Sequence, residues 1–283
     1  MKFHNPQASV FIPDGMASDE AFRRVTHLGI GAHQDDLEIM AFHGIQKCFT
    51  SQELWFGAVT CTNGGGSPRA GEYSACTDED MAALRRREQE KAAIIGNYGG
   101  LVQLNYTSAA VKNVKDEHFR EDLVKVLKAA KPTVVYTHNP ADKHDTHLAV
   151  AFATIAAIRE LPAADRPQVV YGCEVWRGLD WMDDEDKIPL NISAQENLAI
   201  ALIGIYDSQV AGGKSYLDAT LGRRRANATY FQSHETDQAE QLWFAMDLTP
   251  LALDDTLDVA SFVLGHVDKF RASVEAKIRK FSA

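Results

Sequence analysis

The sequence alternates strand-like and helix-like segments over its first two-thirds, and this alternation most constrains the fold. Short apolar segments that predict strands lie at 26–33, 54–62, 101–106, 133–138 and 169–176. Segments that predict helices fall between them, at 37–49, 81–99, 121–131 and 146–161. Such alternation favours a mainly parallel sheet with helices on both faces. We therefore expect a three-layer, Rossmann-like α/β fold.

The last third of the sequence follows a looser pattern. Segment 195–209 predicts a helix, 222–235 is polar and loop-like, and 242–248 predicts another strand. From Thr256 to Phe281 apolar residues recur at helical spacing, which predicts a helix that packs on the core or on another subunit. The length of 283 residues fits a single domain, 1–283, with a helical extension from about residue 254.

Charge and composition exclude several classes of protein. The sequence has 29 basic and 39 acidic residues, and a net charge of −10 would repel nucleic acid. No apolar stretch approaches the roughly 20 residues that cross a bilayer, and the N-terminus does not resemble a signal peptide, so we expect a cytoplasmic location. The four cysteines form no CxxC pair, which argues against a disulfide framework or a thiolate zinc site.

Two clusters of histidine and carboxylate side chains follow predicted strands. The motif AHQDDLE follows the first strand, and NPADKHDTH follows the fourth. The residues concerned are His33, Asp35, Asp36 and Glu38 in the first cluster and Asp142, His144, Asp145 and His147 in the second. In sheets of this kind, functional groups gather beyond the carboxyl ends of the strands. Both clusters therefore stand where a site is expected.

The residue types in these clusters suit a catalytic metal. Such a metal commonly takes three His or carboxylate ligands and leaves a position open for water. His33 and Asp36 from one loop and His147 from the other would supply them, while the neighbouring Asp35 could accept a proton. If a helix begins near His144, this side chain and His147 share one face and reach one pocket. Single residues of these types also occur as turn residues and helix caps, so spacing alone leaves both interpretations open.

The two clusters resemble motifs of the N-acetylglucosaminyl-phosphatidylinositol de-N-acetylases and their LmbE-like relatives. That family carries Ala-His-Pro-Asp-Asp after its first strand, which stands here as AHQDD, Ala32 to Asp36. Its later Asp-x-His-Pro-Asp-His motif aligns without a gap with DKHDTH, Asp142 to His147. Weaker matches are Arg85 and Glu88 in LRRREQEKAAIIG, the pair Ser208 and Gln209, and LGRRR at 221–225.

The resemblance implies a zinc-dependent hydrolase that removes an N-acetyl group from an N-acetylglucosamine-type sugar or a related small acetamide. Another divalent metal is an alternative to zinc, and the resemblance also implies a homo-oligomer. Asp35 would be the general base, a protonated His144 would stabilise the oxyanion, and Arg85 would contact sugar hydroxyls. The implied metal ligands are His33, Asp36 and His147. The alternative function is a metal-binding, non-catalytic or regulatory member of the same fold.

Three departures from the family motifs affect these expectations. Gln34 replaces the usual proline, which should loosen the turn that aims the two carboxylates. Asp145 and Thr146 replace Pro-Asp, so the carboxylate two residues after His144 is missing. His144 should then be less basic, unless Asp142 or Asp145 takes the place of that carboxylate.

Overall fold

The computed structural model describes residues 1–282 and contains an eight-stranded sheet in the order β1-β4-β3-β2-β5-β6-β8-β7. The strands β4, β3, β2, β5 and β6 are parallel, whereas β1 pairs antiparallel with β4, and β8 with both β6 and β7. The mainly parallel, Rossmann-like sheet predicted from the alternation is therefore confirmed. The strands are β1 (Ser9–Phe11), β2 (His27–Gly31), β3 (Phe56–Thr62), β4 (Gly100–Tyr106), β5 (Val134–His138), β6 (Val169–Cys173), β7 (Lys187–Asn191) and β8 (Leu242–Asp247).

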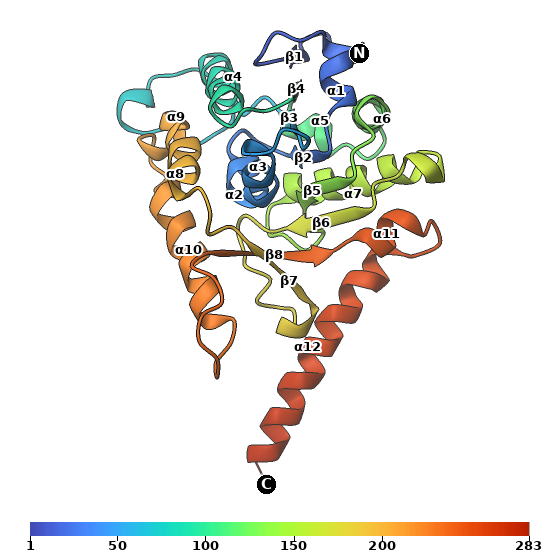
Figure 1. The fold of residues 1–283 in the computed structure, drawn as a ribbon, viewed down its shortest axis with the longest axis vertical. Helices are drawn as coiled ribbons and strands as arrows, with labels where there is room; N and C mark the ends of the chain where they lie inside the picture. The colour runs from blue at the N-terminus through green and yellow to red at the C-terminus, as the bar shows by residue number, and fades with distance from the viewer. Residues whose placement is uncertain (283) are drawn as a thin grey trace.

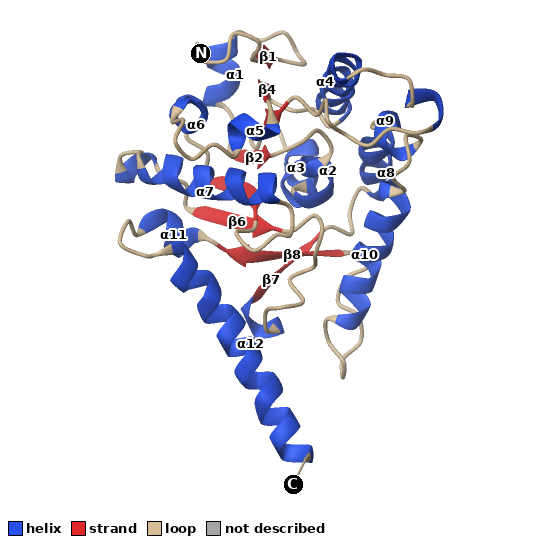
Figure 2. Ribbon diagram, turned by 180° about the vertical axis from the view of Figure 1, so that it is seen from behind, coloured by secondary structure: helices blue, strands red, loops and turns tan. Residues whose placement is uncertain are grey.

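Helices cover both faces of the sheet. In Figure 1, helices α2, α3, α4 and α8 lie to the left of the stacked strands, and α6 and α7 lie to their right; Figure 2 shows the same two layers from behind. The helices are α1 (Ser18–Arg23), α2 (Asp36–Met40), α3 (Phe42–Phe49), α4 (Asp78–Ile95), α5 (Ser108–Val111), α6 (His118–Ala130), α7 (Asp145–Arg159), α8 (Glu196–Gly204), α9 (Asp207–Val210), α10 (Tyr216–Tyr230), α11 (Thr249–Leu253) and α12 (Val259–Phe281). No helix within residues 1–282 has the length and apolar character that crossing a membrane requires.

The prediction of a polar loop at 222–235 was wrong, because α10 continues to Tyr230. Its Arg224 is fully buried and donates hydrogen bonds to the backbone carbonyls of Glu38 and Ile39, at 2.9 and 3.0 Å. The guanidinium also lies 4.8 Å from the centre of the Phe42 ring. Arginine is seldom buried, so the sequence of this segment predicts exposure. Nothing in it indicates that Arg224 packs inside the protein.

Close packing brings α2 and α3 against the sheet. A Cβ atom added to Gly44 of α3 would lie 2.6 Å from the Tyr136 ring of β5, and one added to Gly29 of β2 would lie 2.9 Å from the Leu37 side chain of α2. Both distances are too short for a side chain, so glycine allows this close approach. The packing fixes the start of α2 at the end of β2, where the first His/Asp cluster lies.

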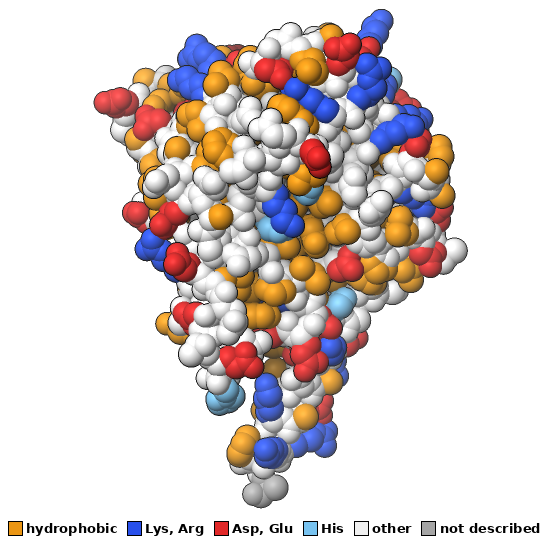
Figure 3. All heavy atoms as spheres, in the orientation of Figure 1, with side chains coloured by type: hydrophobic (Ala, Val, Ile, Leu, Met, Phe, Trp, Pro, Cys, Tyr) orange, Lys and Arg blue, Asp and Glu red, His pale blue; other side chains and the backbone are white. Residues whose placement is uncertain are grey.

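The long helix α12 leaves the body of the molecule, as Figures 1 and 3 show. Its first turns pack on the core through Val259, Phe262 and the buried Val263. An ion pair of 2.8 Å between Lys269 and Asp186 follows. Beyond it, apolar side chains of the predicted stripe such as Ile278 stay exposed. The predicted helix is confirmed, and its core packing is limited to the N-terminal turns.

Candidate metal centre

Both His/Asp clusters lie where the strand order of the sheet reverses. From β2 the chain adds β3 and β4 on one side, then returns to place β5 and β6 on the other side. The crevice beyond the carboxyl ends of β2 and β5 is the usual binding position in such sheets. The loops after β2 and β5 carry the two motifs, so residues more than 100 positions apart meet there.

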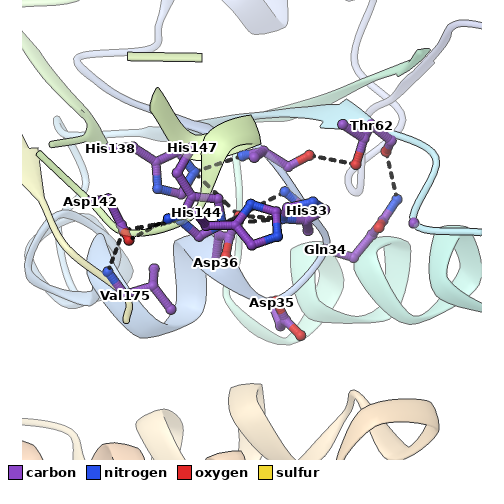
Figure 4. Close-up of polar contacts among 12 residues, drawn as sticks. His33, Gln34, Asp35, Asp36, Thr62, His138, Asp142, His144, His147 and Val175 are labelled. Carbon is purple, nitrogen blue, oxygen red and sulfur yellow. Dashed lines mark hydrogen bonds and ion pairs between the residues drawn. The ribbon is translucent and has the colours of Figure 1, made fainter. Parts of the chain in front are cut away.

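The loop after β2 is held in one conformation by side-chain contacts. Asp35 has a φ of 92°, a strained value for a residue other than glycine. The Gln34 amide donates a 3.0 Å hydrogen bond to the Thr62 carbonyl at the end of β3, as Figure 4 shows. The replacement of proline was expected to loosen this turn, but the buried Gln34 side chain anchors it to the neighbouring strand.

The loop after β5 leads into α7 through Asp142. One carboxylate oxygen of Asp142 accepts the backbone N–H of Lys143 at 2.6 Å and that of His144 at 3.3 Å. The other accepts the Val175 N–H at 3.2 Å and contacts Nδ1 of His147 at 3.0 Å. The residue before α7 is His144, and His147 lies in its first turn. Both imidazoles line one cavity, as their spacing predicted.

Three of the predicted ligand atoms form a compact triangle. Nδ1 of His33 lies 3.2 Å from Nε2 of His147 and 3.4 Å from Oδ2 of Asp36. The third edge, from Nε2 of His147 to Oδ2 of Asp36, measures 3.5 Å. Ligand atoms placed tetrahedrally at about 2.0–2.1 Å from zinc are about 3.3–3.4 Å apart. The triangle thus has the dimensions of three ligands around one zinc ion.

Charges around the triangle favour a cation. Burial opposes ionisation of Asp36, but His147 and His138 outweigh it and hold the pKa of Asp36 well below its usual range. Burial would also lower the pKa of His147, yet Asp36 and Asp142 raise it. Because Asp142 accepts the Nδ1 proton of His147, the Nε2 lone pair can face the triangle. Carboxylates orient metal-binding histidines in this way.

A second group of possible ligands consists of His138, Asp142 and His147. His138 is fully buried, and its Nε2 accepts the Ala32 N–H at 2.8 Å. His138 and Asp142 are not among the residues that line the cavity, whereas His33, Asp36 and His147 are. Since a catalytic metal needs an open position for water, the group that faces the cavity is the better candidate.

Asp35 points away from Asp36 and forms an ion pair with Arg85, as expected for adjacent carboxylates with separate roles (Figure 4). The distance from its Oδ2 to a guanidinium nitrogen is 2.9 Å. Burial raises the pKa of Asp35 to about 8, although Arg85 acts in the opposite direction. Arg85 also donates to the Gln34 carbonyl and the Ser67 hydroxyl. It is buried on α4 and lines the cavity.

His144 has no carboxylate partner in the part of the chain that the structure describes. Its Nδ1 is buried without a hydrogen bond, and Asp142 pairs with His147 instead. Burial, His147 and His33 lower the pKa of His144 below its usual range, which favours the neutral imidazole. This agrees with the weaker basicity expected from the departure in the motif. Its role in catalysis stays a prediction.

The sequence pointed to the floor of this cavity and missed its walls. The cavity has a volume of about 360 Å³, within the range of small-molecule sites. Residues that line it without having been predicted include Lys112, Trp176, Lys214 and Tyr216. His138 was missed as well, although its position at the last residue of a predicted strand could have revealed it.

Comparison with known protein families gives a match to the part of the chain that carries both His/Asp clusters. Residues 28–158 match the PIG-L family, described as GlcNAc-PI de-N-acetylase. The chain contains a PIG-L domain. The match runs from β2 to the end of α7 and includes both His/Asp clusters, so the family predicted from the two motifs is confirmed. No curated protein matches the chain in sequence.

Solved structures share the fold over a longer part of the chain than the PIG-L match covers. The conserved protein TT1542 from Thermus thermophilus has 19% identity and a TM-score of 0.62, over 78% of this chain and 94% of that one. The N,N'-diacetylchitobiose deacetylase from Pyrococcus horikoshii has 18% identity and a TM-score of 0.59, over 82% and 88%. GalB, the 4-carboxy-2-hydroxymuconate hydratase from Pseudomonas putida, has 18% identity and a TM-score of 0.58, over 79% and 95%.

Proposed function

We propose that this protein is a zinc-dependent hydrolase that removes an N-acetyl group from an N-acetylglucosamine-type sugar or a related small acetamide. The observation that carries the proposal is the triangle of His33, Asp36 and His147 on the floor of the cavity, with Asp35 beside it. The PIG-L match supports the reaction, as does the activity named for the Pyrococcus horikoshii structure.

Each group near the triangle has a role in the proposed reaction. When bound by these residues, zinc makes water more acidic and polarises an acyl carbonyl. Asp35 accepts the proton of the attacking water, and its raised pKa suits a base that works near neutral pH. Arg85 holds the Asp35 carboxylate in place through the 2.9 Å ion pair. The neutral His144 donates an N–H hydrogen bond to the oxyanion, and Asp35 returns its proton to the departing amine.

A second candidate function is metal binding without turnover. It is favoured by the absence of a carboxylate partner for His144 within residues 1–282. GalB, named as a hydratase, has the same fold, so the fold alone does not select the reaction. The two candidates differ in whether the zinc-loaded protein releases acetate.

The test measures acetate release from N-acetylglucosamine and N,N'-diacetylchitobiose by zinc-loaded protein. We expect turnover by the wild type and a loss of about 100-fold to 10,000-fold in Asp35→Asn with zinc retained. Asp145→Asn is the matched control, because Asp145 is an exposed carboxylate in the first turn of α7. An Asp35→Asn protein with full activity would exclude the assigned base. Zinc binding without acetate from any acyl amide would favour the second candidate.

A further inference from the structure

The mouth of the cavity is basic, although the chain as a whole has a net charge of −10. The half-buried Lys214 and the exposed Lys112 both line it. Among the described residues that line the cavity, the carboxylates are Asp35 and Asp36. Asp35 is paired with Arg85, and Asp36 contacts the histidines. The charges of the lysines are therefore not balanced by carboxylates of the cavity.

Two lysines, Lys214 of the cavity lining and Lys143 outside it, each lie near the ring of Trp176. Nζ of Lys214 lies 5.5 Å from the centre of a Trp176 ring, and Nζ of Lys143 lies 5.8 Å from it. The Tyr216 ring stands at 75° to that of Trp176, with the ring centres 6.1 Å apart. Lys143 and Trp176 come from the loops after β5 and β6, Lys214 precedes α10, and Tyr216 is the first residue of α10. Trp176, Lys214 and Tyr216 line the cavity, and the exposed Lys143 adjoins its rim through Trp176.

Neither of these two lysines forms an ion pair with a carboxylate in the described part of the chain. Attraction to the face of an indole ring stabilises each ammonium group, while the two positive charges repel one another. An anion bound beside Trp176 would be attracted by both. A divalent metal on the floor of the cavity would add to the attraction.

We propose that the acylated substrate carries an anionic group, a carboxylate or a phosphate, that binds to Lys214 and Lys143 beside Trp176. Its acetamide lies at the same time on the floor, against His33, Asp36 and His147. This inference rests on the proposed function and narrows its substrate class. Lys112, at the C-terminal end of α5, adds positive charge to the same cavity.

The experiment compares neutral and anionic substrates in matched variants. Acetate release is measured from N-acetylglucosamine, N-acetylglucosamine 6-phosphate and N-acetylmuramic acid, which carries a carboxylate. The readout is the ratio of kcat/KM for each anionic substrate to kcat/KM for the neutral one. The proteins are the wild type, Lys214→Ala, Lys143→Ala and the control Lys128→Ala, an exposed lysine on α6.

We expect the wild type to prefer at least one anionic substrate by about tenfold or more, since a hydrogen bond to a charged group contributes that much. Lys214→Ala and Lys143→Ala should reduce the ratio by a similar factor, while Lys128→Ala should leave it unchanged. A preference for the phosphate or for the carboxylate identifies the anion. Equal ratios in all four proteins would overturn the inference.

Direct binding separates this inference from the proposed function. Calorimetric titration of the zinc-loaded proteins with glucosamine and glucosamine 6-phosphate requires no turnover. One outcome is that no acetate is released, but glucosamine 6-phosphate binds more tightly than glucosamine and this difference requires Lys214. The anion site then stands and the deacetylase proposal fails. If acetate is released while neither binding nor kcat/KM depends on the two lysines, the deacetylase proposal stands and the anion site fails.

Discussion

Replacing Asp142 with asparagine should weaken zinc binding without removing a ligand. Oδ2 of Asp142 accepts from the Val175 N–H and lies 3.0 Å from Nδ1 of His147, while Oδ1 accepts from the Lys143 N–H. An asparagine amide has one oxygen and one NH₂ group, so it cannot accept on both sides. If the NH₂ group faces His147, the imidazole must place its proton on Nε2 and loses the lone pair that would bind the metal.

The size of the effect follows from the position of Asp142. A carboxylate that orients a metal-binding histidine typically contributes 10-fold to 100-fold in affinity. The expected loss is therefore about 1.4–2.7 kcal/mol of zinc-binding free energy. If the NH₂ group instead faces the backbone N–H of Lys143, the metal-free protein should lose about 1–3 kcal/mol of unfolding free energy.

The assay is a competition titration of zinc against a chelating indicator, for wild type, Asp142→Asn and Asp145→Asn. Asp145 has an exposed carboxylate on the same segment and serves as the control. Thermal unfolding of each metal-free protein reports any loss of stability separately. A folded Asp142→Asn protein with wild-type zinc affinity would refute the inference that Asp142 orients His147 as a ligand.

The remaining predictions concern the anchoring of the first loop, acid stability and metal removal. Gln34→Ala loses the 3.0 Å hydrogen bond to the Thr62 carbonyl, so the unfolding free energy should fall by about 1 kcal/mol. Zinc affinity should fall as well, because the loop that carries His33 and Asp36 loses its anchor. An unchanged denaturation midpoint and an unchanged zinc titration would contradict this. Burial lowers the pKa of His43 from 6.5 to about 4, so its contribution to stability is complete above pH 6.5 and is lost as the pH falls towards 4. Between pH 7 and pH 5 this loss is about 2 kcal/mol, and the stability of His43→Gln should depend less steeply on pH by that amount in denaturant titrations. Chelation should lower the Tm of wild type more than that of His147→Ala, and equal shifts would show that His147 does not hold the metal.

The alternation of segments predicted most of the fold, because buried parallel strands are short, mostly apolar runs that stand out between helical segments. The five strands β2 to β6 all fall on predicted segments. The short β1 and the proline-containing β7 lie at the edges of the sheet and lack such a pattern. The helical stretch 37–49 divides into α2 and α3 at Ala41, a boundary that no cap or helix-breaking residue marks.

The floor of the site was predictable because its residues stand next to one another in two motifs at strand ends. Trp176, Lys214 and Tyr216 lie in segments whose path depends on tertiary packing, and their sequence carries no pattern that would unite them. The partner of His144 was likewise undecidable from sequence. Asp142 is near both His144 and His147 along the chain, and only the geometry shows that it pairs with His147.

The central claim is that His33, Asp36 and His147 together hold one zinc ion on which hydrolysis depends. Elemental analysis of the purified wild type and of His147→Ala, each paired with acetate release from an N-acetylated amino sugar, tests it most directly. We predict about one zinc per chain and acetate release in the wild type, with both lost in the variant. A wild type that binds no zinc after reconstitution, or a His147→Ala protein that keeps its zinc and activity, would contradict the claim.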